Sequence, residues 1–218
     1  LCLEDTYARI QSRLYQITDE APPELRIATT SFQIGNGLEQ QIEQYLSDFP
    51  KTKLVIIDTF QKVRDSKSTG RKSGMYAGDY DDVTALKNIS DKYGIAVMVV
   101  HHVRKLKDVS DPFNEVSGST GITGAADTNF VLKRSRANET GTLLATGRDI
   151  AYQELTLKFD NHSHLWELVE RKDMEDIHRE EIPKFIFRLV DYISEVKEWR
   201  GTATQLLTQV NETEVTPN

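Results

Sequence analysis

A carboxylate at the end of a short apolar run is the first feature of this chain that could do chemistry. Residues 53–60 read Lys-Leu-Val-Ile-Ile-Asp-Thr-Phe and place Asp58 near the C-terminal end of the run. The β-branched residues predict a strand buried on both faces of a parallel sheet, and ligands bind outside the carboxyl ends of such strands. Asp58 could there hold the Mg²⁺ of a nucleotide through water, as in a Walker B strand. A core strand that ends in a turn or helix-capping Asp is the alternative.

Two histidines follow the next apolar run. Residues 95–100 predict another buried strand, which places His101 and His102 at its end. We expect these imidazoles beside the Asp58 site, because both strands end at the same edge of a parallel sheet. A purely structural role for the histidines is the alternative.

A glycine-rich segment, residues 117–124, reads Ser-Gly-Ser-Thr-Gly-Ile-Thr-Gly. Its glycines would let backbone amides approach phosphates, although it holds no Lys, Arg or aromatic side chain to bind single strands. A plain flexible linker is therefore the alternative. The net charge of the chain is −7, so any nucleic-acid site must be a local basic patch, and residues 62–72 and 104–107 supply two such patches.

Proteins that hydrolyse nucleotides with a Walker B strand also need a phosphate-binding Gly-x-x-x-x-Gly-Lys-Ser/Thr loop. The 218 residues contain no such loop; residues 70–73 come nearest, but Arg71 stands where the loop requires Gly. The sequence also begins within an element at Leu1, without an initiator Met. We expect a fragment without its N-terminal segment, which does not hydrolyse ATP alone.

The composition is that of a soluble globular protein with one good core and a small appendage. Charged residues make up 28% and hydrophobic residues 38% of the chain. No apolar stretch approaches the roughly 18 residues that read as a membrane span, and no signal peptide is visible. The single Cys2 fits a reducing compartment, so a cytoplasmic location is expected.

Alternating helix and strand signals predict an α/β architecture. Residues 1–3 are expected to be the end of a strand, and residues 64–80 a long loop. A helix that Asp81 or Asp82 caps at its start is expected to end at Gly94. The other expected elements are helices over residues 5–17 and 38–49, a short strand over 26–29, and strands of an antiparallel extension over 130–133, 141–147, 154–160 and 165–168.

The last fifty residues differ in character from the rest. Residues 171–181 are a dense charge run, typical of a linker or a solvated helix. An apolar helical stripe over residues 181–196 and a second helix capped by Thr202 follow. These two helices resemble the opening of a winged-helix domain, so residues 182–218 are expected to form a partial helical module.

The order of these motifs resembles that of RecA-like ATPases of the replicative-helicase type, including the helicases of plasmids and the related ATPases of phages and mobile elements. The motifs are Glu4, the Asp58 strand, the His101-His102 strand end, the small residues before Asp127, and Gly147-Arg148-Asp149. The resemblance covers roughly residues 1–170. It implies an α/β fold with a RecA-like, mainly parallel sheet flanked by helices, followed by the antiparallel extension, the linker 171–181 and the partial winged-helix-like module.

The resemblance implies a role for each matching residue. Glu4 matches the carboxylate that orients and deprotonates the attacking water, Asp58 the acid associated with Mg²⁺ in the ATP site, and His102 the polar sensor of the γ-phosphate. His101 is a less favoured sensor. For Glu4 the alternative is an acid at a helix start, stabilised by the helix dipole.

Arg148 matches the position of an arginine finger that acts on the ATP of the neighbouring subunit. Thr146 stands where a companion Lys is common, and a surface pair between Arg148 and Asp149 is the alternative. The family's loop for single-stranded nucleic acid falls on the glycine-rich segment. The residues expected to contact nucleic acid are Ser117, Gly118, Ser119, Thr120 and Gly121, together with Arg104 and Lys105.

The resemblance therefore implies a Mg-ATP-dependent DNA helicase or translocase that assembles as a homo-oligomer, in the form of a hexameric ring. Its partner would be DNA, in single-stranded form, during replication of a mobile element or phage. The alternative is a non-catalytic RecA-like adaptor or loader that binds DNA or a helicase. A phosphate-binding loop upstream of Leu1 would favour the enzyme over the adaptor.

Overall fold

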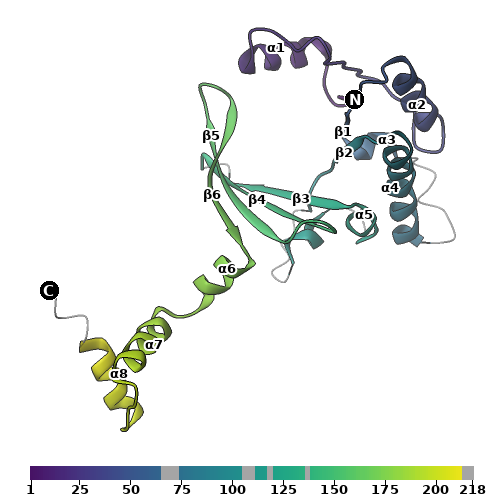
Figure 1. Ribbon diagram of the computed structural model, residues 1–218. Helices are drawn as coiled ribbons and strands as arrows, with labels where there is room; N and C mark the ends of the chain where they lie inside the picture. Colours follow the sequence, from purple (N-terminus) through teal and green to yellow (C-terminus); the bar gives the residue numbers. More distant parts are fainter. Residues whose placement is uncertain (65–73, 105–110, 117–119, 136–137, 213–218) are drawn as a thin grey trace. The chain divides into compact units, whose positions relative to one another are not determined.

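The computed structural model describes residues 1–64, 74–104, 111–116, 120–135 and 138–212 (Figure 1). The chain divides into two compact units, Leu1–Arg171 and Lys172–Asn218, and each is described by itself. None of the helices in the described ranges combines the length and apolar character that a membrane span requires.

The first unit contains helices and two separate sheets (Figure 1). Its elements in chain order are α1 (Tyr7–Ile17), α2 (Leu38–Asp48), β1 (Leu54–Asp58), α3 (Phe60–Val63), α4 (Gly74–Tyr93), β2 (Ala96–Val100), the 3-10 helix η2 (Pro112–Glu115), α5 (Thr120–Ala125), β3 (Thr128–Arg134), β4 (Thr140–Gly147), β5 (Gln153–Asp160) and β6 (Leu165–Asp173), the last of which runs into the second unit.

The two sheets differ in direction and size. β1 and β2 pair in parallel, with Leu54 opposite Ala96 and Asp58 opposite Val100. The order β3-β4-β5-β6 makes a four-stranded sheet, in which β4 pairs antiparallel with both β3 and β5. The mixed α/β class and the antiparallel extension are confirmed. The strands of the described residues do not form one mainly parallel sheet, because the antiparallel part is the larger.

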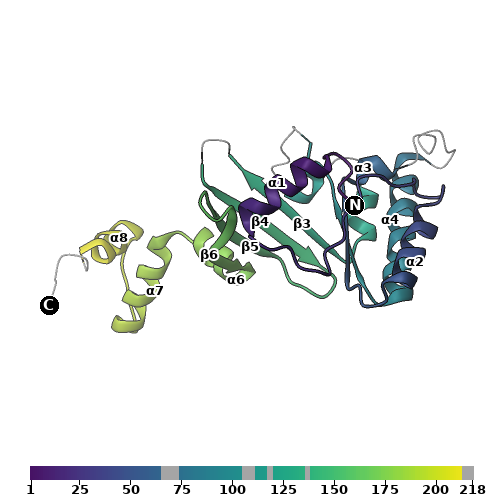
Figure 2. The ribbon, with the colours of Figure 1, turned by 90° about the horizontal axis from the view of Figure 1, so that it is seen from above.

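The hydrophobic core lies on one face of the β1–β2 sheet. α2 and α4 lie side by side (Figures 1 and 2) and contribute the apolar residues Leu38, Ile42, Leu46, Val83, Leu86 and Ile89 to it. Ile57 is fully buried among them, whereas its neighbours Leu54 and Ile56 are exposed. The expectation that β1 is buried on both faces is wrong, since successive side chains point to opposite faces and the core residues pack on one of them.

α4 begins earlier than its sequence predicts. Its first residue is Gly74, so the expected loop over 64–80 is wrong from Gly74 onwards, and residues 65–73 lie outside the described part. Asp81 and Asp82 are inside this helix and do not cap it. Gly94, with φ near +60°, follows the last residue of α4 as expected.

Two other short predictions change. The segment expected as a strand over residues 26–29 is not one; Ala28 only accepts a hydrogen bond from the Cys2 amide (2.9 Å). The glycine-rich segment is not a loop throughout, because Thr120–Ala125 form α5. Gly121 and Ile122 are buried in α5, which packs against α4, so tertiary packing overrides the low helix propensity of two glycines.

The second unit is helical. α6 (Met174–Glu181) starts with a capping box at Asp173, α7 spans Lys184–Val196, and α8 spans Ala203–Glu212. The charge run is therefore the end of β6 followed by a solvated helix. Thr202 caps α8 as predicted, since its Oγ1 accepts from the Gln205 amide (3.3 Å) and its own amide donates to the Gln205 side chain (2.8 Å).

Candidate functional site

Three neighbouring chain segments end at the same edge in the first unit. Leu1–Leu3 runs parallel to β1: the Asp58 amide donates to the Leu1 carbonyl (2.8 Å), and the Leu3 amide donates to the Asp58 carbonyl (2.6 Å). β1 in turn pairs in parallel with β2. Asp58 is the last residue of β1, Glu4 directly follows Leu1–Leu3, and His102 lies two residues after β2, as the order of the motifs predicts.

The Glu4 carboxylate lies between a hydroxyl and an imidazole. Its Oε1 accepts a hydrogen bond from Thr59 Oγ1 (3.2 Å), and its Oε2 lies 4.0 Å from His102 Nε2. The two oxygens of one carboxylate thus face groups from two different strand ends. This geometry brings together two of the residues predicted from the sequence, Glu4 and His102.

Glu4 is not an acid at the start of a helix. Thr6 caps α1, because its hydroxyl accepts from the Arg9 amide (3.4 Å), and the first turn of α1 holds no acidic residue. Asp5, rather than Glu4, faces α1 and forms ion pairs with Arg9 (3.1 Å) and Arg13 (2.5 Å). Glu4 therefore lies outside α1, two residues before its N-cap Thr6.

Thr59 is a residue of this site that sequence patterns do not single out. It is almost completely buried, and its hydroxyl donates to Glu4. A buried hydroxyl must find a hydrogen-bond partner, so the Thr59 side chain fixes the direction of one carboxylate oxygen. Its position directly after Asp58 is the signal that could have found it.

The two histidines have different surroundings. His101 is partly buried, and its ring meets the buried Phe60 ring edge to face, with centroids 5.6 Å apart. His102 is largely exposed and faces Glu4. Of the two imidazoles, His102 is the one that lies at the carboxylate, whereas His101 packs beside the core.

A hollow of about 250 Å³ lies beside Glu4 and Asp58. Its wall combines Glu4 and Asp58 with Cys2 and with apolar side chains of α1, namely Ile10, Leu14 and Ile17. Carboxylate oxygens are the ligands that Mg²⁺ takes in small number while keeping its waters. The Asp58 carboxylate is thus of a type that suits a hydrated Mg²⁺, whereas the described residues supply no glycine-rich cradle for phosphates.

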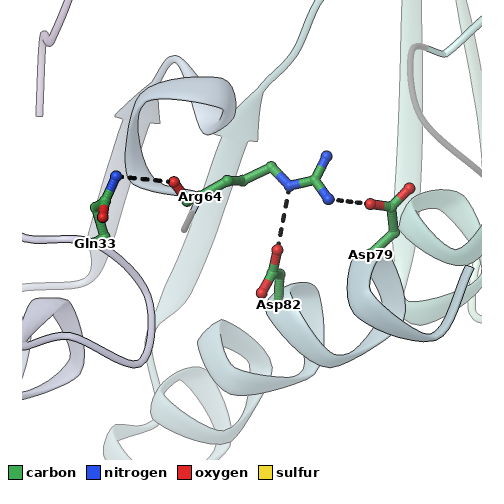
Figure 3. A network of polar contacts seen from close by, with 4 residues as sticks. All are labelled: Gln33, Arg64, Asp79 and Asp82. Atoms are coloured by element: carbon green, nitrogen blue, oxygen red, sulfur yellow. Dashed lines mark hydrogen bonds and ion pairs between the residues drawn. The ribbon is translucent and has the colours of Figure 1, made fainter. Parts of the chain in front are cut away.

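A largely buried ionic network holds Arg64, at the end of the short helix α3 that follows β1 (Figure 3). Arg64 follows α3, and its guanidinium donates to Asp82 through Nε (3.2 Å) and to Asp79 through an Nη. Both carboxylates project from α4 and are buried. The network therefore joins the segment after the candidate site to the helix that carries much of the core.

The same arginine is held through its backbone. The Gln33 side-chain amide donates to the Arg64 carbonyl (3.1 Å), and the Ile34 amide donates to the Val63 carbonyl (2.7 Å). The guanidinium also lies over the Phe60 ring, 5.5 Å from its centroid. Sequence patterns place Arg64 only in a basic patch, because nothing in them shows that Asp79 and Asp82 are buried.

Arg148 lies in a second ionic cluster. Its Nη1 is 3.1 Å from Asp127 Oδ1, and Lys87 of α4 donates to Asp127 Oδ2. The hydrogen bond from Lys87, and more weakly the charge of Arg148, lowers the pKa of the Asp127 carboxyl below its ordinary value. The partner of Arg148 is thus Asp127, which precedes β3, rather than Asp149 as in the alternative of a surface pair.

The residues expected to contact nucleic acid are only partly described. Lys105, Ser117, Gly118 and Ser119 lie outside the described residues. Arg104 is exposed, and its amide donates to the Glu115 carbonyl (2.5 Å). Thr120 and Gly121 lie in the first turn of α5, as noted above.

The comparisons with known proteins bear on the segment that carries the candidate site. Residues 1–108 match the family model of the AAA domain. The AAA-matching segment is thus similar to a nucleotide-binding domain of the ATPase type, which uses a nucleotide and Mg²⁺, and it contains Glu4, Asp58, Thr59 and His102. Arg148 lies outside the matched residues. No curated protein matches the chain.

Proposed function

We propose that this chain is part of a RecA-like, ring-forming ATPase of the DNA helicase or translocase type, which acts in the replication of a mobile element or phage. The observation that carries the proposal is the convergence of Glu4, Asp58 and His102 at the ends of adjacent parallel segments. Ligands of parallel sheets bind at that edge. The match of this segment to the AAA domain supports a nucleotide as the ligand.

The residues have distinct tasks in this proposal. Glu4 accepts a proton from the attacking water, while the Thr59 hydroxyl holds one of its oxygens in place. Asp58 would hold Mg²⁺ through its water shell, and the ion would supply charge neutralisation at the phosphates. His102, in reach of the second Glu4 oxygen, links the hydrolytic centre to the segment after β2.

A second candidate function is a non-catalytic adaptor or loader of the same fold. The two candidates differ in one measurable property, since an adaptor has no site that turns over ATP.

The test uses the complete gene product that contains these residues. Glu4→Gln should lower ATP turnover by about 100-fold or more, because a general base contributes that much, while the affinity for Mg-ATP is retained. Glu24→Gln is the matched control, since Glu24 is exposed, and it should leave turnover unchanged. Near-normal turnover of Glu4→Gln would overturn the catalytic role. No ATP turnover in the unaltered protein, with single-stranded DNA present, would favour the adaptor.

A further inference from the structure

One carboxylate in the first unit is shared by two cations from different elements. Asp127 Oδ1 lies 3.1 Å from Arg148 Nη1, just after β4, and Asp127 Oδ2 accepts a hydrogen bond from Lys87 of α4. Each oxygen therefore has its own cationic partner. Lys87 holds the carboxylate from the helix side, so that the other oxygen keeps a fixed direction toward Arg148.

The backbone fixes the same pair of residues. The Arg148 amide donates to the Asp127 carbonyl (2.9 Å). Gly147 makes this approach possible, because a Cβ at Gly147 would lie 2.6 Å from that carbonyl oxygen and 2.9 Å from Thr128 Oγ1. The position of Arg148 relative to Asp127 is thus set by main chain and side chain together.

The cluster is open to solvent. The Arg148 side chain is 55% exposed and the Asp127 side chain 48%. Exposed ion pairs contribute little to the stability of a folded protein, so this contact is poorly suited to holding the fold together. A guanidinium has five N–H donors in a planar fork, and Asp127 faces only the Nη1 end. The rest of the fork can meet a second anion.

We propose that Asp127 is the positioning residue of Arg148, and that it presents the guanidinium to an anionic group bound by a second copy of this chain. The inference rests on the proposed function, in which Arg148 acts on the nucleotide of the neighbouring subunit. Lys87 contributes indirectly, because it orients the Asp127 carboxylate and this carboxylate in turn orients Arg148.

The activity test again uses the complete gene product. Asp127→Asn should lower kcat by about 10-fold, since a misplaced catalytic group loses rate rather than substrate affinity, and KM for ATP should change less than about 2-fold. Asp127→Glu keeps the charge and should recover part of kcat. The matched control is Asp149→Asn, which removes an exposed carboxylate next to Arg148 and should leave kcat unchanged.

The outcomes separate this inference from the proposed function. If Arg148→Ala lowers turnover and Asp127→Asn does not, the positioning role is overturned while the proposed function stands. If Arg148→Ala leaves turnover unchanged, there is no finger to position and the inference falls. If Asp127→Asn raises KM and leaves kcat unchanged, Asp127 acts on nucleotide binding and the inference is likewise overturned.

A readout without nucleotide uses the 218-residue chain. The pKa of the Asp127 carboxyl, followed by carbon NMR, should rise toward its ordinary value in Lys87→Met and should rise less in Arg148→Ala, because the Lys87 hydrogen bond is the largest cause of its lowering. An unchanged Asp127 pKa in both variants would show that the cluster does not form in solution, and would overturn the inference.

Discussion

The Arg64 network and the Asp127 cluster use the same chemistry in opposite surroundings. In the first, one arginine serves two carboxylates, and the side chains of Arg64, Asp79 and Asp82 are only 15%, 0% and 6% exposed. In the second, one carboxylate serves two cations and faces solvent. A buried ion that loses its partner is left uncompensated, whereas an exposed one is solvated by water. Burial therefore makes the first network structural and leaves the second able to exchange partners.

The largest expected effect comes from breaking the buried network. Arg64→Met should lower the free energy of unfolding by about 3–5 kcal/mol, because Asp79 and Asp82 stay buried without their arginine. Arg148→Met is the matched control and should cost no more than about 1 kcal/mol. Urea denaturation of the 218-residue chain, followed by circular dichroism, measures both. Equal losses in the two variants would contradict the comparison.

A double variant should sharpen the comparison. Adding Asp79→Asn to Arg64→Met removes one of the two buried charges that the single variant leaves behind. The double variant should therefore be more stable than the sum of the two single changes predicts, by an interaction energy of about 1–3 kcal/mol. Strict additivity in urea denaturation would mean that Arg64 and Asp79 do not interact in the folded protein.

The smallest expected effect concerns acid stability at the exposed cluster. The pKa of Asp127 is lower in the folded state than its ordinary value of 3.8. Its ion pairs therefore add stability above about pH 4, and this contribution is lost as the pH falls toward the lowered pKa. The stability difference between the unaltered chain and Asp127→Asn should be full at pH 6 and shrink below pH 4. A stability difference that grows as the pH falls would contradict the lowered pKa of Asp127.

Much of the fold follows from local patterns. The β-branched runs predict β1 and β2. The four short apolar segments after residue 129, separated by short connections, predict β3 to β6. The start of α4 could not be predicted in this way. The composition of Gly74–Tyr80 indicates a loop, and the ion pair between Asp79 and Arg64, which ties this segment to the core, has no signal in the sequence. Side chains that are polar by type but buried by tertiary partners carry no periodic signal.

The candidate site was predictable to the extent that it depends on strand order. Glu4, Asp58 and His102 meet because each lies at or just after the end of a neighbouring parallel segment. The contacts between side chains were not predictable. The Thr59 hydroxyl on Glu4 and the Asp127 partner of Arg148 depend on how loops return to the sheets, which sequence spacing does not determine.

The most direct test of the claim that the exposed arginine serves a neighbouring site is a mixing experiment with the complete gene product. Arg148→Ala and Glu4→Gln proteins should each have lost most ATP turnover, by about 1,000-fold and 100-fold or more. In randomly mixed rings, about a quarter of the interfaces combine Arg148 from one variant with Glu4 from the other. The account predicts that turnover recovers toward that fraction. Mixed rings that assemble and remain inactive would contradict it.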